Sequence, residues 1–288
     1  MKTLTIGLCT ISTRNENYLL STLDSILTHT DEKEQNEFQI VVFDCDLQED
    51  DSIYITEVKN TFAQQIEQGL IHIVKTSKND YTFLNKNLLP NLDDLPKWLY
   101  WRSKQCLDVS LIMAYCAARS QYYLHLEDDV ICTDHFYPKM MNDIKPLTDE
   151  QWCAVKFCEI GFIGLLFQNT ELNKLSTFIK CLFDEMPIDW LIENHYFSIK
   201  AVNGKKCIQI SRSLFQHIGY YSSLTGKIQG LQSASFEAIF DMEFFKRNEN
   251  FFDFLDSKIE EKGKLIKINN QLSFLQKLRN SMKIKIEK

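Results

Sequence analysis

The chain has 288 residues with a formal net charge of −7, and 44% of its residues are hydrophobic and 25% charged. This length suits one large α/β domain or two small ones, and the composition is that of a globular protein and not of a disordered chain. The acidic balance argues against broad binding to nucleic acid or to anionic membranes, because both favour basic surfaces. A nucleotide ligand is compatible with it, since one local cation can neutralise a diphosphate.

The sequence shows no pattern of a targeting or membrane-spanning segment. The start, MKTLTIG, lacks the apolar stretch of a signal peptide, and no later stretch approaches the roughly 20 apolar residues needed to span a bilayer. The 9 cysteines are scattered and form no CxxC pair, which favours free thiols in a reducing compartment. We therefore expect a cytoplasmic protein, or one at the periphery of a membrane, without a transmembrane segment.

The first quarter of the chain alternates between strand and helix patterns. Short apolar runs rich in β-branched residues predict buried strands at 3–10, 38–43 and 70–74. Between them, apolar residues at helical spacing predict one helix that begins near Tyr18 and a second that contains Ile55 and Ile66 and ends at Gly69. This alternation implies a mostly parallel sheet with right-handed crossovers.

The later part of the chain continues the α/β pattern and then changes character. A helix is predicted from about Trp98 to Arg119, a strand at 122–126, a strand at 152–157 and a helix at 172–182. From Phe236 onward, aromatic residues and a Lys-rich end predict helices that pack on the domain or touch a membrane surface. The chain thus divides into an α/β domain at 1–235 and a helical extension at 236–288.

An acidic triplet, Glu127, Asp128 and Asp129, follows the strand predicted at 122–126. Open α/β sheets bind ligands at the carboxyl ends of their strands, and carboxylates are preferred ligands of hard divalent cations. A cation held there can screen a diphosphate, although a solvated acidic turn is the alternative interpretation. The sequence has no GxGxxG and no P-loop lysine motif, which disfavours dinucleotide-binding and P-loop enzymes.

A second group of polar residues lies on the helix predicted before this strand. Arg102 has a planar guanidinium that suits paired phosphate oxygens. Lys104 and Asp108 are four residues apart and could form a surface ion pair worth roughly 0.3–0.5 kcal/mol.

Further candidates lie in the second half of the chain. Asp189 stands among apolar residues in PIDWL, where it could act as a general base or cap a helix. His217 is a candidate metal ligand, although a lone histidine among apolar neighbours is usually a core residue. The segment 221–227 offers hydroxyl groups and Lys227, which suit a phosphate and a turn equally.

Taken together, these segments resemble a known family. An acid pair at Asp44 and Asp46 is followed by WRSKQCLD, YYLHLEDDV, GFIGLLFQ, PIDWL and SLFQHIGYYSSLTGK, in the order seen in the N-acetylglucosaminyltransferase IV family. The resemblance covers about residues 4–226. It implies a GT-A glycosyltransferase fold with a Rossmann-like sheet and a bound divalent cation. It also implies transfer of GlcNAc from UDP-GlcNAc, in a β1,4 linkage, to an α1,3-linked core mannose of N-glycans.

The resemblance also implies roles for individual residues. Asp129 and His217 would ligate Mn²⁺ or Mg²⁺, and Asp189 would be the catalytic base of an inverting transfer. The donor-binding residues would be Thr10, Arg14, Asp46, Arg102, Glu127, Asp128, Ser222, Ser223 and Lys227. Residues 79–96 and 160–168 are expected to help choose the acceptor.

Some features depart from the family and leave alternatives open. Golgi members of the family carry an amino-terminal membrane anchor and a lectin-like carboxyl-terminal extension, whereas we expect no Golgi-anchored form here. The acceptor could therefore be a bacterial or viral surface glycan, a lipid-linked sugar or a host glycan, and the donor another UDP-sugar. A metal-dependent phosphoesterase and a glycan-binding relic without turnover are the other classes, the former disfavoured because it usually needs a second metal cluster.

Overall fold

The computed structural model describes residues 2–14, 16–85, 88, 92, 94–147, 151–224, 227 and 233–236. Of the predicted helical extension at 236–288, Phe236 alone belongs to these residues, and it forms an isolated bridge with Ser213. The rest of the extension lies outside the described residues.

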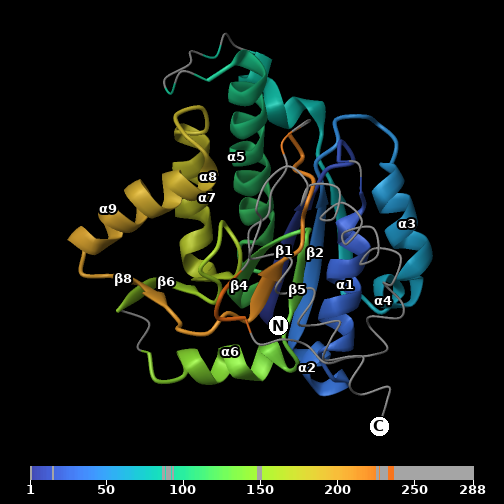
Figure 1. Cartoon of the computed structure of the whole chain (residues 1–288), viewed down its shortest axis with the longest axis vertical. Coiled ribbons are helices and arrows are strands. Elements are labelled where there is room, and N and C mark those ends of the chain that lie inside the picture. Colours follow the sequence, from blue (N-terminus) through green and yellow to red (C-terminus); the bar gives the residue numbers. More distant parts are fainter. Residues whose placement is uncertain are drawn as a thin grey trace, which may run out of the picture.

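A seven-stranded sheet with the order β3-β2-β1-β4-β7-β6-β8 forms the centre of the molecule (Figure 1). Four strands run parallel at one side, and these are β1 (Lys2–Thr10), β2 (Phe38–Asp44), β3 (Ile71–Lys75) and β4 (Ser120–Glu127). Next to β4, β7 (Leu165–Gln168) runs antiparallel to both of its neighbours, while β6 (Trp152–Lys156) and β8 (Lys206–Gln209) pair in parallel. The predicted mostly parallel α/β sheet is confirmed, and the antiparallel β7 is an addition to it.

Helices cover both faces of this sheet (Figure 1). Side chains of α1 (Tyr18–Thr28), α3 (Ile53–Thr61), α4 (Ala63–Glu67) and α6 (Phe136–Ile144) pack in the core on one face. The other face is covered by α5 (Pro96–Cys116), α7 (Leu172–Cys181) and a continuous helical run made of α8 (Ile188–Trp190), the π-helix η3 (Leu191–Tyr196) and α9 (Phe197–Val202). The remaining helices are α2 (Glu32–Glu37) and the 3₁₀ segments η1 (Lys78–Asn85) and η2 (Asn169–Glu171).

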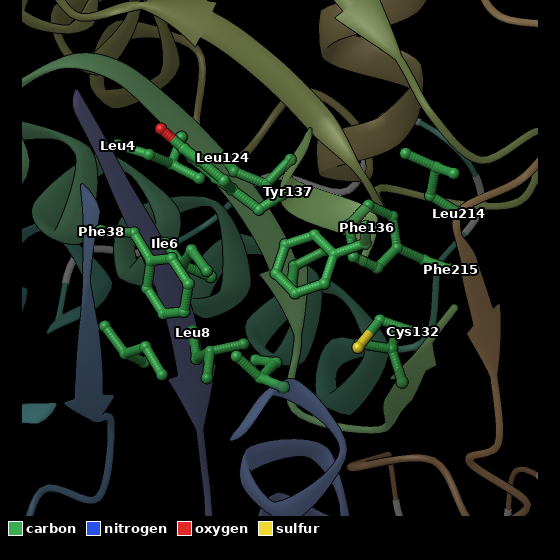
Figure 2. Close-up of a cluster of buried hydrophobic side chains, with 14 of the residues drawn as sticks. Leu4, Ile6, Leu8, Phe38, Leu124, Cys132, Phe136, Tyr137, Leu214 and Phe215 are labelled. Atoms are coloured by element: carbon green, nitrogen blue, oxygen red, sulfur yellow. The ribbon is translucent and has the colours of Figure 1, made fainter. Parts of the chain in front are cut away.

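Alternation along the strands explains why the sheet has two apolar faces. Leu4, Ile6 and Leu8 of β1 point into the core that also holds Phe38 and Phe136 (Figure 2). On the opposite face, Gly7 leaves space for a neighbouring ring, because a Cβ atom there would lie 2.3 Å from Oη of Tyr123. The strand is therefore buried on both sides, as expected for the centre of a parallel sheet.

Two predicted helices differ in their limits from the helices observed. The helix predicted through Ile55 and Ile66 is broken at Phe62, where the backbone leaves the helical region (φ −113°, ψ 31°) and separates α3 from α4. α5 ends at Cys116 and not at Arg119, because Ala118 adopts a left-handed conformation (φ 64°). The predicted C-cap at Gly69 has the positive φ of 73° that favours glycine.

A second, two-stranded sheet lies beyond the end of β4. Its strands are β5 (Val130–Cys132) and β9 (Phe215–His217), which pair antiparallel with Val130 opposite His217. All 9 cysteines are described and have free thiols. In the described part of the chain, no helix combines the length and the hydrophobicity that crossing a bilayer requires.

Candidate active site

The acidic triplet lies where the sequence predicts it, at the carboxyl end of β4. Thr22 of α1 holds its backbone, since the hydroxyl donates to the carbonyl of Asp128 (2.9 Å) and accepts from the amide of Val130 (3.0 Å). Asp128 and Asp129 are each 3% exposed, whereas the side chain of Glu127 is 27% exposed. The fixed turn thus sends two carboxylates inward and one toward a cavity.

The pairing of β5 with β9 brings His217 to this turn. The amide of Ile218 donates to the carbonyl of Asp129 (2.8 Å), and Nε2 of His217 lies 3.3 Å from Oδ2 of Asp129 and 4.0 Å from Oε2 of Glu127. One ligand atom from each of these three side chains lies within 4.8 Å of the other two. Carboxylate and imidazole groups at this spacing form a donor set suited to Mn²⁺ or a similar divalent cation.

One buried atom of this cluster is not satisfied by the protein. Oδ1 of Asp129 has no hydrogen-bond partner, although its other oxygen has several. Buried carboxylate oxygens are normally paired, so an orphaned one in a group of ligand-type side chains fits the binding of a cation. The residues present therefore fit the metal that the family resemblance implies.

Gly219 allows the close approach of the chain behind Asp129. A Cβ atom at this position would lie 2.0 Å from Oδ2 and 2.7 Å from Cγ of Asp129. Any larger residue would push the carboxylate away from His217. Gly219 was not predicted as a site residue, because nothing in the local sequence shows which side chain approaches it.

Arg14 contacts both aspartates of the triplet. Its Nη1 lies 2.6 Å from Oδ2 of Asp129 and 3.1 Å from Oδ1 of Asp128. Tyr54 fixes the backbone of Arg14 by donating its hydroxyl to the carbonyl (2.8 Å), and the guanidinium lies 5.8 Å from the centre of the Tyr18 ring. The predicted donor-binding residue is thus placed directly beside the predicted metal ligand.

Burial and charge separate the ionisation of these groups. Burial, reinforced by Asp129, raises the pKa of Glu127 to about 7. Burial alone would raise the pKa of Asp129 as well, but Arg14 and His217 hold it well below its usual range. For His217, burial opposes the charged form, yet Asp129 outweighs it and raises the pKa. Asp129 is thus the anionic centre of the cluster, while Glu127 is poised to exchange a proton near neutral pH.

Asp189 lines a cavity of about 500 Å³ that the cluster also lines. Glu127, His217 and Lys227 line the same cavity, together with residues 160–163 of the segment expected to help choose the acceptor. Asp189 lies in the first turn of α8, but the N-cap is Pro187 and receives no side-chain hydrogen bond. The capping alternative therefore does not account for Asp189, whose place in the cavity wall suits a reactive carboxylate.

A smaller cavity, of about 70 Å³, adjoins the large one. Thr10, Arg14, Asp128 and Ser223 line it, all of which the sequence analysis assigns to the donor. Trp101 and Gln105 line both cavities, so the two meet at these residues. The indole Nε1 of Trp101 donates to Oγ of Ser223 (2.8 Å), and Lys227 lies 5.3 Å from its ring centre.

The predicted surface pair of Lys104 and Asp108 is wrong in its location. The pair forms, with Nζ 2.9 Å from Oδ1, but both residues are 7% exposed and line the smaller cavity. Lys104 also donates to the carbonyl of Cys45 (2.7 Å), and Tyr81 donates to Asp108 (2.5 Å). Burial alone would lower the pKa of Lys104, but Asp108 raises it. The pair is therefore a fixed polar element of the cavity wall.

Three predicted donor-binding residues line neither cavity. Nε of Arg102 is 2.6 Å from Oδ2 of Asp94, and its Nη1 donates to the carbonyl of Asp184 (2.8 Å). Asp46 accepts from the amide of Ser12 (2.9 Å), and Ser222 accepts from the amide of Leu224 (3.1 Å). In the described residues these side chains hold loops around the site, and their contact with a donor stays a prediction.

Two aromatic residues of the site were missed. Trp101 and Trp190 line the large cavity, and Trp190 is 53% exposed although it is a large apolar side chain. Their positions in the sequence could have indicated them, because Trp101 directly precedes Arg102 and Trp190 directly follows Asp189. Exposed aromatic rings beside a reactive carboxylate suit the apolar faces of sugars.

Curated relatives were found for about four fifths of the chain. It is 33% identical over 245 residues to alpha-1,3-mannosyl-glycoprotein 4-beta-N-acetylglucosaminyltransferase A of Xenopus tropicalis, which covers 80% of this chain and 45% of that protein. It is 34% identical over 235 residues to alpha-1,3-mannosyl-glycoprotein 4-beta-N-acetylglucosaminyltransferase C of Sus scrofa, and the match covers 81% of this chain and 48% of that protein. The chain thus spans a little under half the length of these relatives.

Solved structures with a similar arrangement have low sequence identity to the chain. The mannosyltransferase PcManGT from Pyrobaculum calidifontis, in complex with GDP-Man and Mn²⁺, is 13% identical with a TM-score of 0.47, covering 72% of this chain and 54% of that one. The galactosyltransferase LgtC, with donor and acceptor sugar analogues, is 14% identical with a TM-score of 0.37, covering 67% and 65%.

The decisive comparison is with a protein family. The family model described as the MGAT4 conserved region matches residues 1–236, which include every site residue described above. The helix-flanked, mostly parallel sheet agrees with the α/β fold of GT-A type expected from the sequence. The chain belongs to the family of the MGAT4 conserved region.

Proposed function

We propose that the chain transfers a sugar from a nucleotide-diphosphate donor to a hydroxyl group of a glycan, with inversion at the anomeric carbon. The observation that carries the proposal is the large cavity, which is lined both by Glu127 and His217 of the cation cluster and by Asp189. A leaving group stabilised on one side and a base on the other are the requirements of a single displacement.

The donor extends from the small cavity into the large one. Thr10, Lys104 and Asp108 in the small cavity surround the nucleoside, and Arg14 and the triplet face the diphosphate. Asp129 and His217, with Glu127 close to both, would hold Mn²⁺ or Mg²⁺. When bound, the cation screens the diphosphate and stabilises the negative charge that develops on it as the bond to the sugar breaks.

Asp189 acts as the general base. Its carboxylate takes the proton from the acceptor hydroxyl, whose oxygen forms the new bond at the anomeric carbon while the bond to the diphosphate breaks. Trp190 and Phe162 line the cavity near Asp189 and provide apolar surface for the sugar rings. Lys227, from the same wall as Trp101, supplies a positive charge near the leaving group.

The proposed substrates are supported by the names of the relatives. The relatives' names specify an N-acetylglucosaminyl group and an alpha-1,3-mannosyl glycoprotein. We infer UDP-GlcNAc as the donor and a mannose-containing glycan as the acceptor, with a β1,4 linkage. Another UDP-sugar or a bacterial or viral surface glycan is the alternative within the same chemistry.

The proposal is tested by a transfer assay with Mn²⁺, a panel of nucleotide sugars and an array of mannose-terminated and other glycans. We expect release of UDP and addition of one sugar to the acceptor, with UDP-GlcNAc preferred. EDTA should abolish transfer, and excess Mn²⁺ should restore it. Failure to transfer from any donor, in a folded chain that binds UDP, would identify a binding relic instead.

A further inference from the structure

Arg14, which follows β1, contacts Oδ2 of Asp129 from outside the triplet, on the same oxygen that His217 approaches. Its guanidinium bridges Asp129 and Asp128 at 2.6 and 3.1 Å. We propose that Arg14 is an internal counter-cation. It neutralises the aspartates while no divalent cation is bound, and it turns from Asp129 to the donor's diphosphate when one binds. The second half rests on the proposed function, whereas the first half stands on the contacts alone.

The surroundings of Asp129 explain why Arg14 and a divalent cation compete for its carboxylate. Oδ2 is contacted by Arg14 and by His217, and Gly219 closes the third side so tightly that a Cβ atom would lie 2.0 Å away. Two positive charges on one buried carboxylate repel each other strongly, because little water screens them. A divalent cation bound by Asp129 and His217 therefore weakens the hold of the carboxylate on Arg14.

Arg14 also has a second place to bind. Its side chain lines the small cavity, and its Nε is buried without a hydrogen-bond partner. The hydroxyl of Tyr54 anchors the backbone carbonyl, so the guanidinium can turn while the chain stays fixed. A guanidinium released from Asp129 keeps a planar set of donors that matches two oxygens of a diphosphate.

This arrangement couples the two ligands. The cation alone binds weakly because the positive charge of Arg14, 2.6 Å from Oδ2, repels a cation that binds the unpartnered Oδ1 of the same carboxylate. The diphosphate relieves this repulsion by accepting the guanidinium. Binding of either ligand should therefore strengthen binding of the other. No change in the backbone is required.

The experiment compares Mn²⁺ binding to the full chain by calorimetry, first without nucleotide and then with saturating UDP. Arg14→Gln removes the counter-cation, and Arg14→Lys keeps its charge. Arg212→Gln is the matched control, because it removes an arginine that pairs with Asp143 (3.0 Å) away from the triplet. Thermal unfolding with and without Mn²⁺ provides a second readout that needs no nucleotide.

Without nucleotide, Arg14→Gln should bind Mn²⁺ about tenfold more tightly than the unaltered chain, or better, and gain more thermal stability from it. UDP should strengthen Mn²⁺ binding by the unaltered chain and by Arg14→Lys, but much less by Arg14→Gln. The Arg212→Gln control should behave as the unaltered chain does.

Equal or weaker Mn²⁺ binding by Arg14→Gln would overturn the inference, as would the lack of any Mn²⁺ binding by all variants. The result is separable from the fate of the proposed function. Tighter Mn²⁺ binding by Arg14→Gln in a chain that transfers no sugar would support the counter-cation and refute the transferase. Active sugar transfer by the unaltered chain, with the same Mn²⁺ binding in Arg14→Gln, would support the transferase and refute the counter-cation.

Discussion

At the scale of single residues, Asp129 is surrounded by groups from two other parts of the chain. Arg14 follows β1, Asp129 follows β4, His217 ends β9 and Gly219 lies just beyond it. Each contact constrains Oδ2, while Oδ1 has no partner in the protein. The carboxylate is thus oriented in advance, with one oxygen left for a ligand.

Replacing Gly219 by alanine tests this orientation. The new Cβ would lie 2.0 Å from Oδ2, so the carboxylate must move away from His217. We expect Mn²⁺ affinity, measured by calorimetry in the presence of UDP, to fall roughly 10–100-fold.

The control is Gly204→Ala. Gly204 has a positive φ of 75° and open space around it, so alanine there costs about 1–2 kcal/mol of backbone strain without touching the site. Equal effects of the two variants on Mn²⁺ affinity would contradict the role of Gly219.

At the scale of elements, the acidic turn depends on α1 as much as on β4. The Thr22 hydroxyl is the link, with one hydrogen bond to each side of the turn (2.9 and 3.0 Å). The short pair of β5 and β9 then sets His217 opposite Val130, directly beside the turn. The site is therefore formed by α1, by β4 and by the pair of β5 and β9 together, and not by one loop.

Thr22→Val keeps the shape of the side chain but removes both hydrogen bonds. Because the carbonyl and amide of the turn lose a buried partner, we expect the free energy of unfolding to fall by about 1–3 kcal/mol in a urea titration. Mn²⁺ affinity should fall too, since the triplet is less well held. Thr28→Val in the same helix, away from the turn, should leave Mn²⁺ affinity unchanged, and a loss of similar size there would argue against the link.

The ion pairs of Glu171 make the stability of the fold depend on pH. Glu171, in η2, pairs with Lys200 of α9 and with Lys205 (3.2 Å). Burial alone would raise the pKa of Glu171, but the two lysines lower it below its usual value of 4.5. A carboxylate whose pKa is lower in the folded than in the unfolded chain stabilises the fold at any pH above its pKa in the unfolded chain. This contribution is lost as the pH falls to its pKa in the folded chain.

Glu171→Gln should therefore cost about 1–3 kcal/mol near neutral pH, and the difference from the unaltered chain should shrink below pH 4.5. Urea unfolding across this range measures it. The control, Glu193→Gln, removes a more exposed pair with Lys156 and should change stability by about 0–1 kcal/mol. A Glu171 effect that grows as pH falls would contradict the assignment.

At the scale of the whole molecule, the site lies at the carboxyl ends of the parallel strands. Register pairs Thr10 with Asp44 and Cys9 with Glu127, so the ends of β1, β2 and β4 meet there. Cores on both faces of the sheet keep these ends fixed relative to one another. Trp101 and Gln105 line both cavities, so the two parts of the proposed substrate site adjoin each other.

Much of this arrangement could be predicted from local patterns. The parallel strands are continuous apolar runs, and the triplet directly follows one of them, so its position at the sheet edge followed from the chain order. The pairing of β5 with β9 could not be predicted, because each strand has three residues and the contact spans a long stretch of sequence. Burial of Lys104 and Asp108 was missed for a related reason, since helical spacing reveals the pair but not the sheet and loops that cover it.

The central claim is that Asp189 removes the acceptor proton while the triplet and His217 hold the donor. The most direct test compares Asp189→Asn with the unaltered chain for UDP-GlcNAc binding and for transfer to the preferred acceptor. Asp184→Asn, the same change in the same segment but outside the cavity lining, is the control. We expect Asp189→Asn to bind the donor normally and to transfer about 10²–10⁴-fold more slowly, while Asp184→Asn stays active. Transfer by Asp189→Asn at the unaltered rate would contradict the account.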